Sequence, residues 1–204
     1  MKLFLASLAS ATLDLVYPLL RDKPSNLKLA FIPTAADPYP ADSRPWMDSD
    51  RVKLIEMGFA VTDYDLKNKN IDILRSELSL YHVIFVAGGN TYYLLNEVKK
   101  SGFDIVIKEL IDKGTVYIGS SAGSVIMCPT IDHTRKIEHP ESVPDLKDYS
   151  ALNLTDKLIA PHYGNPKYRE RYEQIKSEWG DKILLLRDDQ AFFINGDKIE
   201  LVTK

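Results

Sequence analysis

The chain has 204 residues, of which 45% are hydrophobic and 27% are charged, close to the averages of globular domains. These values exclude disordered, collagen-like and coiled-coil chains, and the length predicts one domain over residues 1–204. The formal net charge of −3 disfavours a nucleic-acid partner, because a protein that holds a phosphate backbone normally carries an excess of lysine and arginine.

The N-terminal segment combines Lys2 with a short apolar run and small residues, which is the outline of a secretory signal peptide. Because the run is short and Asp14 follows it, we interpret residues 2–7 as a buried first strand. The chain has no run of 18 apolar residues, so we expect no membrane partner and a cytoplasmic location. The single cysteine, Cys128, permits neither an internal disulfide bond nor a cysteine metal cluster.

Short apolar runs alternate with amphipathic segments along the chain. The predicted strands cover residues 3–5, 27–32, 60–64, 83–87, 116–119, 158–160, 183–186, 192–194 and 199–202. The predicted helices cover residues 12–21, 45–57, 71–80, 91–100, 103–113, 122–127 and 167–179. Pro18 is expected to disturb the first helix, and Asp42 or Ser43 can cap the second. The alternation predicts an α/β sandwich with a mostly parallel sheet, and Asn195-Gly196 predicts an antiparallel C-terminal hairpin.

The segment TVYIGSSAGS, residues 115–124, runs from a predicted strand into a predicted helix. Its G-x-S-x-G pattern, centred on Ser121, is typical of a nucleophile elbow, a strained turn that tolerates only very small neighbours. Such a turn would expose the hydroxyl of Ser121 at the carboxyl edge of the sheet. Ser120 and Ser124 are weaker candidates, because neither lies at the centre of the turn.

An activated serine needs a general base, and the chain has four histidines. His162 follows the predicted strand 158–160, so we expect it at the same sheet edge as Ser121. His133, in the irregular stretch after the elbow, is the alternative base. His82 precedes a strand and is expected at the opposite edge.

A carboxylate is expected to orient the base. Asp188 and Asp189 both follow the predicted strand 183–186, and their spacing does not decide between them. The other candidates are Asp132, Asp145 and Asp156. We expect no metal or other cofactor, with a mixed site around residues 132–141 as a minor alternative.

A glycine pair after the strand 83–87, in the sequence Gly88-Gly89-Asn90-Thr91, allows backbone N–H groups to approach a ligand closely. We expect one N–H from Gly89 and one from Ala122 to form an oxyanion hole. The alternative is a nucleotide-phosphate loop, which is disfavoured because the full G-x-G-x-x-G fingerprint is absent.

Three segments together, AGGNTYYLL, IGSSAGS and APHYGN, resemble peptidase family S51, the family of dipeptidase E and cyanophycinase. The resemblance spans nearly the whole chain and includes LAFIPTAA at 29–36 and DYSALNL at 148–154. It implies a three-layer α/β/α sandwich of the flavodoxin-like type, similar to class I glutamine amidotransferases, with the nucleophile on an elbow.

The resemblance also implies roles for individual residues. Ser121 matches the family's nucleophile and His162 its base, while Gly89 and Ala122 match its oxyanion-hole positions. Asp188 aligns with the third member of the triad, which is usually a glutamate in the family and therefore reaches one methylene further.

Substrate recognition is implied in the same way. Asn90 matches a substrate-side asparagine, and Arg169 matches the arginine that binds a substrate carboxylate. Aspartyl dipeptidases have an acidic residue about fifteen positions after the nucleophile, where this chain has Lys136, with Asp132 and Glu138 nearby.

The sequence therefore predicts a serine peptidase that cleaves short peptides, in particular dipeptides with an N-terminal aspartate. An esterase of the α/β-hydrolase type is one alternative, although such enzymes have the chain order Ser, acid, His. A non-catalytic ligand-binding protein on the same scaffold is another, favoured by the departures at Lys136 and Asp188. Both a monomer and a homodimer remain compatible with the sequence.

Overall fold

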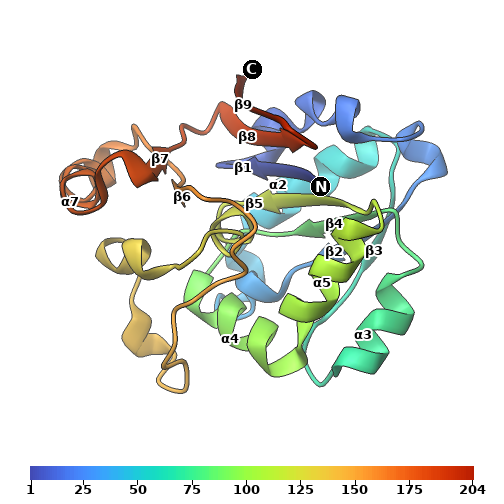
Figure 1. Ribbon diagram of the computed structural model, residues 1–204, viewed down its shortest axis with the longest axis horizontal. Coiled ribbons are helices and arrows are strands. Elements are labelled where there is room, and N and C mark those ends of the chain that lie inside the picture. The colour runs from blue at the N-terminus through green and yellow to red at the C-terminus, as the bar shows by residue number, and fades with distance from the viewer.

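The computed structural model describes residues 1–204, and a seven-stranded sheet forms its centre (Figure 1). In spatial order the strands are β3 (Ala60–Asp63), β2 (Lys28–Ile32), β4 (Val83–Val86), β5 (Val116–Ser120), β1 (Lys2–Ala6), β8 (Gln190–Asn195) and β9 (Lys198–Thr203). The first five of these run parallel, β8 is antiparallel to β1, and β9 is antiparallel to β8.

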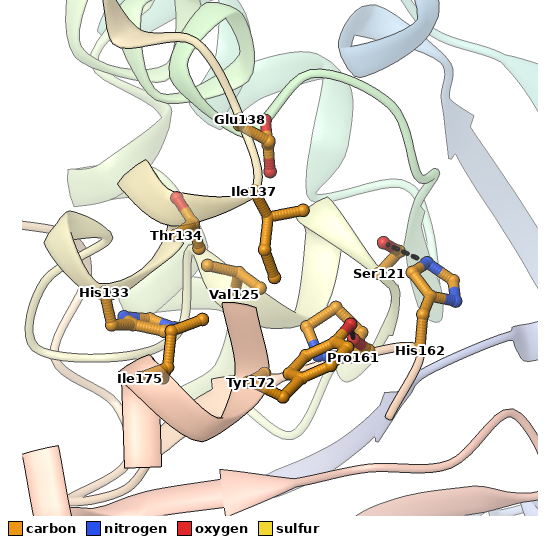
Figure 2. Close-up of a pocket in the computed structure, with 11 residues that line it drawn as sticks. Ser121, Val125, His133, Thr134, Ile137, Glu138, Pro161, His162, Tyr172 and Ile175 are labelled. Carbon is orange, nitrogen blue, oxygen red and sulfur yellow. Dashed lines mark hydrogen bonds between the residues drawn. The ribbon is translucent and has the colours of Figure 1, made fainter. Parts of the chain in front are cut away.

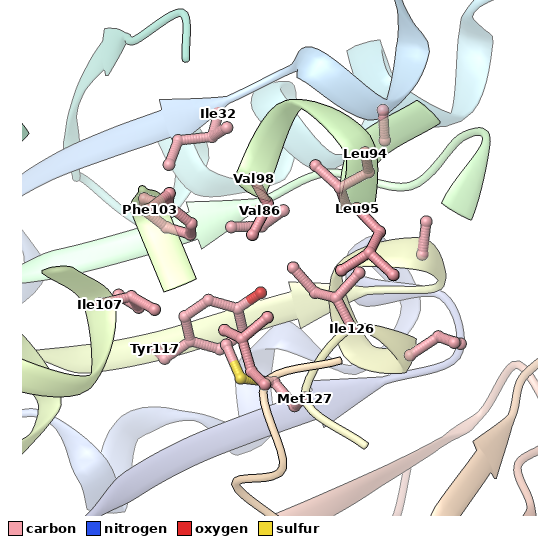
Figure 3. Packing of buried hydrophobic residues seen from close by; sticks show 14 of the residues in the cluster. Ile32, Val86, Leu94, Leu95, Val98, Phe103, Ile107, Tyr117, Ile126 and Met127 are labelled. Carbon is pink, nitrogen blue, oxygen red and sulfur yellow. The ribbon is translucent and has the colours of Figure 1, made fainter. Parts of the chain in front are cut away.

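Both faces of the central strands are covered, because these strands are apolar on both sides, whereas the edge strands β3 and β9 are mostly exposed. In β1, Leu3 and Leu5 belong to one buried cluster while Phe4 and Ala6 belong to the other, as the two-residue period of a strand requires. The first face packs against α3 (Ile71–Leu78), α4 (Thr91–Ser101) and α5 (Phe103–Asp112). Figure 3 shows side chains of α4 and α5 packed around Tyr117. The second face packs against α1 (Ala9–Thr12) and α2 (Pro45–Glu56). The predicted three-layer α/β/α sandwich and its antiparallel C-terminal hairpin are confirmed.

The N-terminal half of the chain departs locally from the predicted elements. The helix expected over residues 12–21 does not form. The helix α1 ends at Thr12, and only the single turns Leu13–Leu15 and Tyr17–Leu19 follow, since proline at 18 has no N–H to donate and clashes with the preceding turn. Helix α2 begins at Pro45 without a side-chain cap, because residues 41–43 form a separate turn. The expected caps at Asp42 and Ser43 were therefore wrong.

A second small sheet lies beside the main one. Strands β6 (Leu158–Ala160) and β7 (Ile183–Leu185) pair only with each other, and α7 (Arg169–Trp179) packs next to them (Figure 1). The sequence placed His162 at the same sheet edge as Ser121, whereas the strand that precedes His162, β6, belongs to this second sheet. Directly after β5 the chain forms the short helix α6 (Ala122–Val125), where the sequence predicted a helix over residues 122–127. No helix of the structure has the length and apolar character needed to cross a membrane.

Candidate active site

The elbow at Ser121 is strained, and its sequence explains why. Ser121 has φ +47° and ψ −106°, a conformation that costs a non-glycine residue on the order of 1–3 kcal/mol. A Cβ atom on Gly119 would lie 2.6 Å from the carbonyl group of Gly123, and one on Gly123 would overlap the carbonyl oxygen of Val86. The close approach of these backbones therefore requires both glycines of the G-x-S-x-G pattern.

The hydroxyl of Ser121 faces an imidazole. Its Oγ lies 2.9 Å from Nε2 of His162, as Figure 2 shows, and Nδ1 of His162 lies 2.7 Å from Oδ1 of Asp188. The hydrogen bond from His162 holds the pKa of the Asp188 carboxyl below its usual range, although partial burial opposes this effect. The three residues thus form one continuous hydrogen-bonded series.

The neighbouring aspartate has a different partner. Asp189 forms an ion pair with Arg187, at 3.0 Å, on the surface. Asp132 pairs with Arg135, and Asp145 and Asp156 are exposed. Of the five candidate acids, the structure brings Asp188 to the histidine.

The alternative residues around the elbow have other hydrogen-bond partners. His133 is buried and its Nε2 lies 2.8 Å from the carbonyl oxygen of Ile159, whereas the imidazole bonded to Ser121 is that of His162. Ser120 accepts a hydrogen bond from the N–H of Ala9, and Ser124 donates to the carbonyl oxygen of Ala6. Neither hydroxyl competes with that of the central serine.

His82 and His139 have partners elsewhere and are not bonded to Ser121. Nδ1 of His82 accepts from the N–H of Lys28 at the amino edge of the sheet, and His139 pairs with Glu141 on the surface.

The glycine pair after β4 lies beside the elbow, since a Cβ atom on Gly88 would be 3.2 Å from that of Ser121. Gly89 has φ +148°, and its N–H donates to no backbone carbonyl. The N–H of Ala122 is the first of α6 and so has no acceptor within the helix. Oδ1 of Asn90 accepts from the N–H of Tyr93 and thereby caps α4. Two unpaired donors therefore flank the serine.

A cleft of about 670 Å³ opens over Ser121 and His162, with walls that include Tyr39, Trp46 and Tyr168. A smaller cavity of about 40 Å³ adjoins the cleft and is also lined by Ser121 and His162. Figure 2 shows the side chains of this smaller cavity, whose lining is mixed. Apolar side chains such as Val125, Ile137 and Ile175 alternate with the polar side chains of Thr134 and Glu138.

Glu138 lines both cavities, a placement that no motif in the sequence indicated. Its carboxylate accepts hydrogen bonds from the N–H and the hydroxyl of Thr91, the first residue of α4. Burial raises the pKa of Glu138 to about 7, and no lysine or arginine pairs with it. In the sequence, Glu138 lies two residues after Lys136, the position where the resemblance led us to expect an acid. The side chain of Lys136 itself pairs with Glu178 on α7.

The predicted carboxylate-binding arginine does not reach the cleft. Arg169 is exposed at the start of α7 and lines neither cavity. Lys167, two residues earlier, lines the cleft and forms no ion pair. The irregular turn before α7 therefore brings a different cation to the site than the one the sequence suggested. No group of three or more His, Cys, Asp or Glu side chains is arranged to hold a metal ion.

The model of peptidase family S51 matches residues 4–202 of the chain. The chain belongs to peptidase family S51. This S51 member is therefore a serine peptidase. It is 34% identical over 194 residues to an uncharacterized peptidase of Listeria monocytogenes, covering 93% of each chain. It is 31% identical over 198 residues to an uncharacterized peptidase of Pasteurella multocida, covering 96% of this chain and 94% of that one.

Other similarities to this S51 peptidase are local or structural. Peptidase E of Escherichia coli is 36% identical over 83 residues, which is 41% of this chain and 34% of that protein. A crystal structure of a candidate peptidase E protein from Listeria monocytogenes EGD-e superposes with a TM-score of 0.91 at 30% identity, covering 100% of this chain and 98% of that one. A peptidase from an acI-B1 Actinobacterium, at 14% identity and a TM-score of 0.74, shares the fold.

Proposed function

We propose that this S51 peptidase hydrolyses short peptides through an acyl-enzyme formed on Ser121. The observation that carries the proposal is the continuous hydrogen bonding from Ser121 through His162 to Asp188. In this proposal Oδ1 of Asp188 accepts a hydrogen bond from Nδ1–H of His162, which leaves Nε2 free to accept the proton of the serine hydroxyl.

The reaction then follows from this geometry. As Oγ of Ser121 attacks the scissile carbonyl, its proton moves to Nε2 of His162. The N–H groups of Gly89 and Ala122 would stabilise the oxyanion, and one such donor contributes about 2.7–4 kcal/mol in comparable sites. The imidazolium next protonates the leaving amine, and a water molecule activated by the same histidine releases the acyl group.

Glu138 is proposed to bind the free amino group of the substrate. Its carboxylate faces the cleft that contains Ser121 and has no basic partner, so a substrate ammonium would supply the missing positive charge. The same ammonium would favour the ionised carboxylate and lower the pKa of Glu138 when substrate binds. A peptide held by its amino terminus beside the nucleophile would be cut after its first residues.

Dipeptides with an N-terminal aspartate are the proposed substrate class. In this proposal the side-chain carboxylate binds Lys167, because this cation lines the cleft and is free of ion pairs, whereas Arg169 lies outside the cleft. Asn90, on the wall of the cleft, has its Nδ2 group available as a further donor after its Oδ1 has capped α4.

The esterase alternative finds no support in the position of the acid. The carboxylate bonded to His162 follows it in the sequence, whereas Asp145, the acid that precedes it, is exposed. The order Ser, His, acid differs from that of the α/β-hydrolases.

A fluorophosphonate probe and a dipeptide panel test the proposal. We expect the probe to label the wild-type protein at Ser121 and to leave Ser121→Ala unlabelled. We expect Asp-Leu to be hydrolysed with a higher kcat/KM than Asn-Leu or Leu-Leu. Absence of labelling would reject the serine mechanism, whereas labelling with equal turnover of the three dipeptides would reject only the aspartate preference.

A further inference from the structure

Strand β1 lies between the strand that leads to the nucleophile and the strand that follows the acid, in the order β5-β1-β8. The N–H of Ser121 donates to the carbonyl oxygen of Ala6 at 3.0 Å, and the N–H of Ser7 donates to the carbonyl oxygen of Gln190 at 3.2 Å. The carboxyl end of β1 is therefore bonded to the elbow on one side and to the segment after Asp188 on the other.

The side chain of Ser7, the residue after β1, contacts the acid and the base at once. Its hydroxyl donates to Oδ1 of Asp188 at 2.8 Å and accepts from the backbone N–H of His162 at 2.7 Å. The same Oδ1 accepts from Nδ1 of His162 at 2.7 Å, so the three residues close a ring of hydrogen bonds. Ser7 is buried at the border of the cleft, so its hydroxyl makes these bonds out of contact with bulk solvent.

His162 needs such a partner because of its backbone. Its φ of +63° is rarely adopted by a side-chain-bearing residue and persists only where the surroundings hold it. It also follows β6, which belongs to the small sheet. The bond to Ser7 is therefore a direct link between the backbone of His162 and the end of a main-sheet strand.

The hydroxyl of Ser7 also fixes the orientation of Asp188. Two donors, one from His162 and one from Ser7, converge on a single carboxylate oxygen and so fix the rotation of this short side chain. After the larger effect of His162, the bond from Ser7 adds to the lowering of the Asp188 pKa. The acid is thereby kept ionised and aimed at the imidazole.

We propose that Ser7 is a positioning residue for the triad, which orients Asp188 and the backbone of His162 so that Nε2 faces Ser121. This role rests on the proposed function for its catalytic effect, but the hydrogen bonds that it fixes can be measured in the resting protein.

The kinetic test compares Ser7→Ala with Ser7→Thr, which keeps a hydroxyl, and with Ser101→Ala as a matched control. Ser101 is also buried, but its hydroxyl bonds to the carbonyl oxygen of Glu97 at the far end of α4. For Ser7→Ala we expect kcat to fall about 10- to 100-fold with KM within about twofold, the loss expected for a hydrogen bond to a charged group. Ser7→Thr is expected to recover most of this loss, and Ser101→Ala to retain wild-type kcat.

A double-mutant cycle separates positioning from a merely structural effect. In an Asp188→Ala background, adding Ser7→Ala is expected to lower the remaining kcat by less than about threefold, because the carboxylate that Ser7 orients is already gone and only the bond of Ser7 to the His162 backbone remains. An equal loss in both backgrounds would overturn the positioning role.

NMR of protein labelled with ¹⁵N-histidine reads the same geometry without substrate. We expect a low-field Nδ1–H resonance of His162 in the wild type and in Ser101→Ala, and its loss or upfield shift in folded Ser7→Ala. An unchanged resonance in folded Ser7→Ala would overturn the inference. If the wild type hydrolysed no peptide, the proposed function would fail, while this spectrum would still decide the role of Ser7.

Discussion

Nδ1 of His162 lies 2.7 Å from Oδ1 of Asp188, whereas the adjacent Asp189 turns away and pairs with Arg187. We therefore expect Asp188→Asn to lower kcat by about 10³- to 10⁴-fold, because an amide at this position favours the wrong imidazole tautomer. Asp189→Asn, the matched control, is expected to stay within twofold of the wild type. Steady-state kinetics on Asp-Leu checks both variants, and a large loss in Asp189→Asn would contradict the assignment.

The carboxylate of Glu138 leads to a prediction about substrate chemistry. If it binds the free amine, Glu138→Gln is expected to lower kcat/KM for Asp-Leu about 10- to 100-fold, the usual range for a charged hydrogen bond. Acetylating the amine of the substrate should cost the wild type a similar factor and should cost Glu138→Gln little more. Independent, multiplicative losses in this comparison would show that the two groups do not meet.

The cation of the cleft can be identified by a pair of variants. Lys167→Ala is expected to raise KM for Asp-Leu about tenfold and to leave KM for Leu-Leu unchanged, because only the first substrate has a side-chain carboxylate. Arg169→Ala is expected to change neither value, since Arg169 is exposed outside the cleft. A substrate-specific effect at Arg169 alone would restore the assignment made from the sequence.

Gly89 is expected to tolerate no side chain. A Cβ atom there would overlap the carbonyl group of Ala35, which already accepts the N–H of Asn90 at 2.8 Å. We expect Gly89→Ala to abolish measurable turnover and to lower the free energy of unfolding by about 3 kcal/mol, as for a buried clash added to an unfavourable φ. Gly114→Ala is the control, because Gly114 also has positive φ but a Cβ atom there would meet no atom within 4 Å. We expect this variant to keep full activity and to lower the free energy of unfolding by about 1 kcal/mol.

A buried carboxyl beneath the site gives a pH-dependent stability. Oδ1 of Asp50 accepts from the N–H of Ser10, while Oδ2 is buried without a partner, and burial raises the pKa of Asp50 to about 6. Because this folded-state pKa exceeds the unfolded value, the folded protein is favoured while Asp50 is protonated and loses this advantage as pH rises from about 4 to 6.

Asp50→Asn keeps the acceptor for Ser10 and removes the charge. We expect the free energy of unfolding of Asp50→Asn, minus that of the wild type, to rise by up to about 3 kcal/mol between pH 4 and pH 7, which is the equivalent of two pKa units. Urea unfolding at pH 4, 5.5 and 7 measures this difference. A difference that does not change with pH would show that Asp50 does not titrate in this range.

Local sequence was sufficient to predict the elbow and the central strands of the main sheet. The glycines around Ser121 are required by contacts within a few residues and with the adjacent strand β4, so their spacing alone indicates the turn. The central strand β4 is apolar throughout, which is the expected pattern when both faces are covered. His162 and Asp188 could be proposed because each follows a strand.

The reason given for His162 was nevertheless incomplete. Its strand, β6, is not part of the main sheet, and the imidazole reaches Ser121 from a neighbouring two-stranded sheet. A rule about strand ends selected the right residue without describing how it arrives, because pairing between distant strands cannot be derived from the residues of one segment.

By itself, the sequence of 204 residues, with its mildly acidic charge, predicted an α/β pattern, a serine elbow and a glycine-rich turn beside the elbow. These features depend on backbone sterics and on apolar periodicity, which act over short stretches of chain. Tertiary structure decided that Ser7 joins the acid to the base, that Glu138 enters the cleft and that Lys167 lines it where Arg169 does not. These placements depend on irregular turns and on strand order, where residues far apart in the chain fix each other's position, and no local pattern records them.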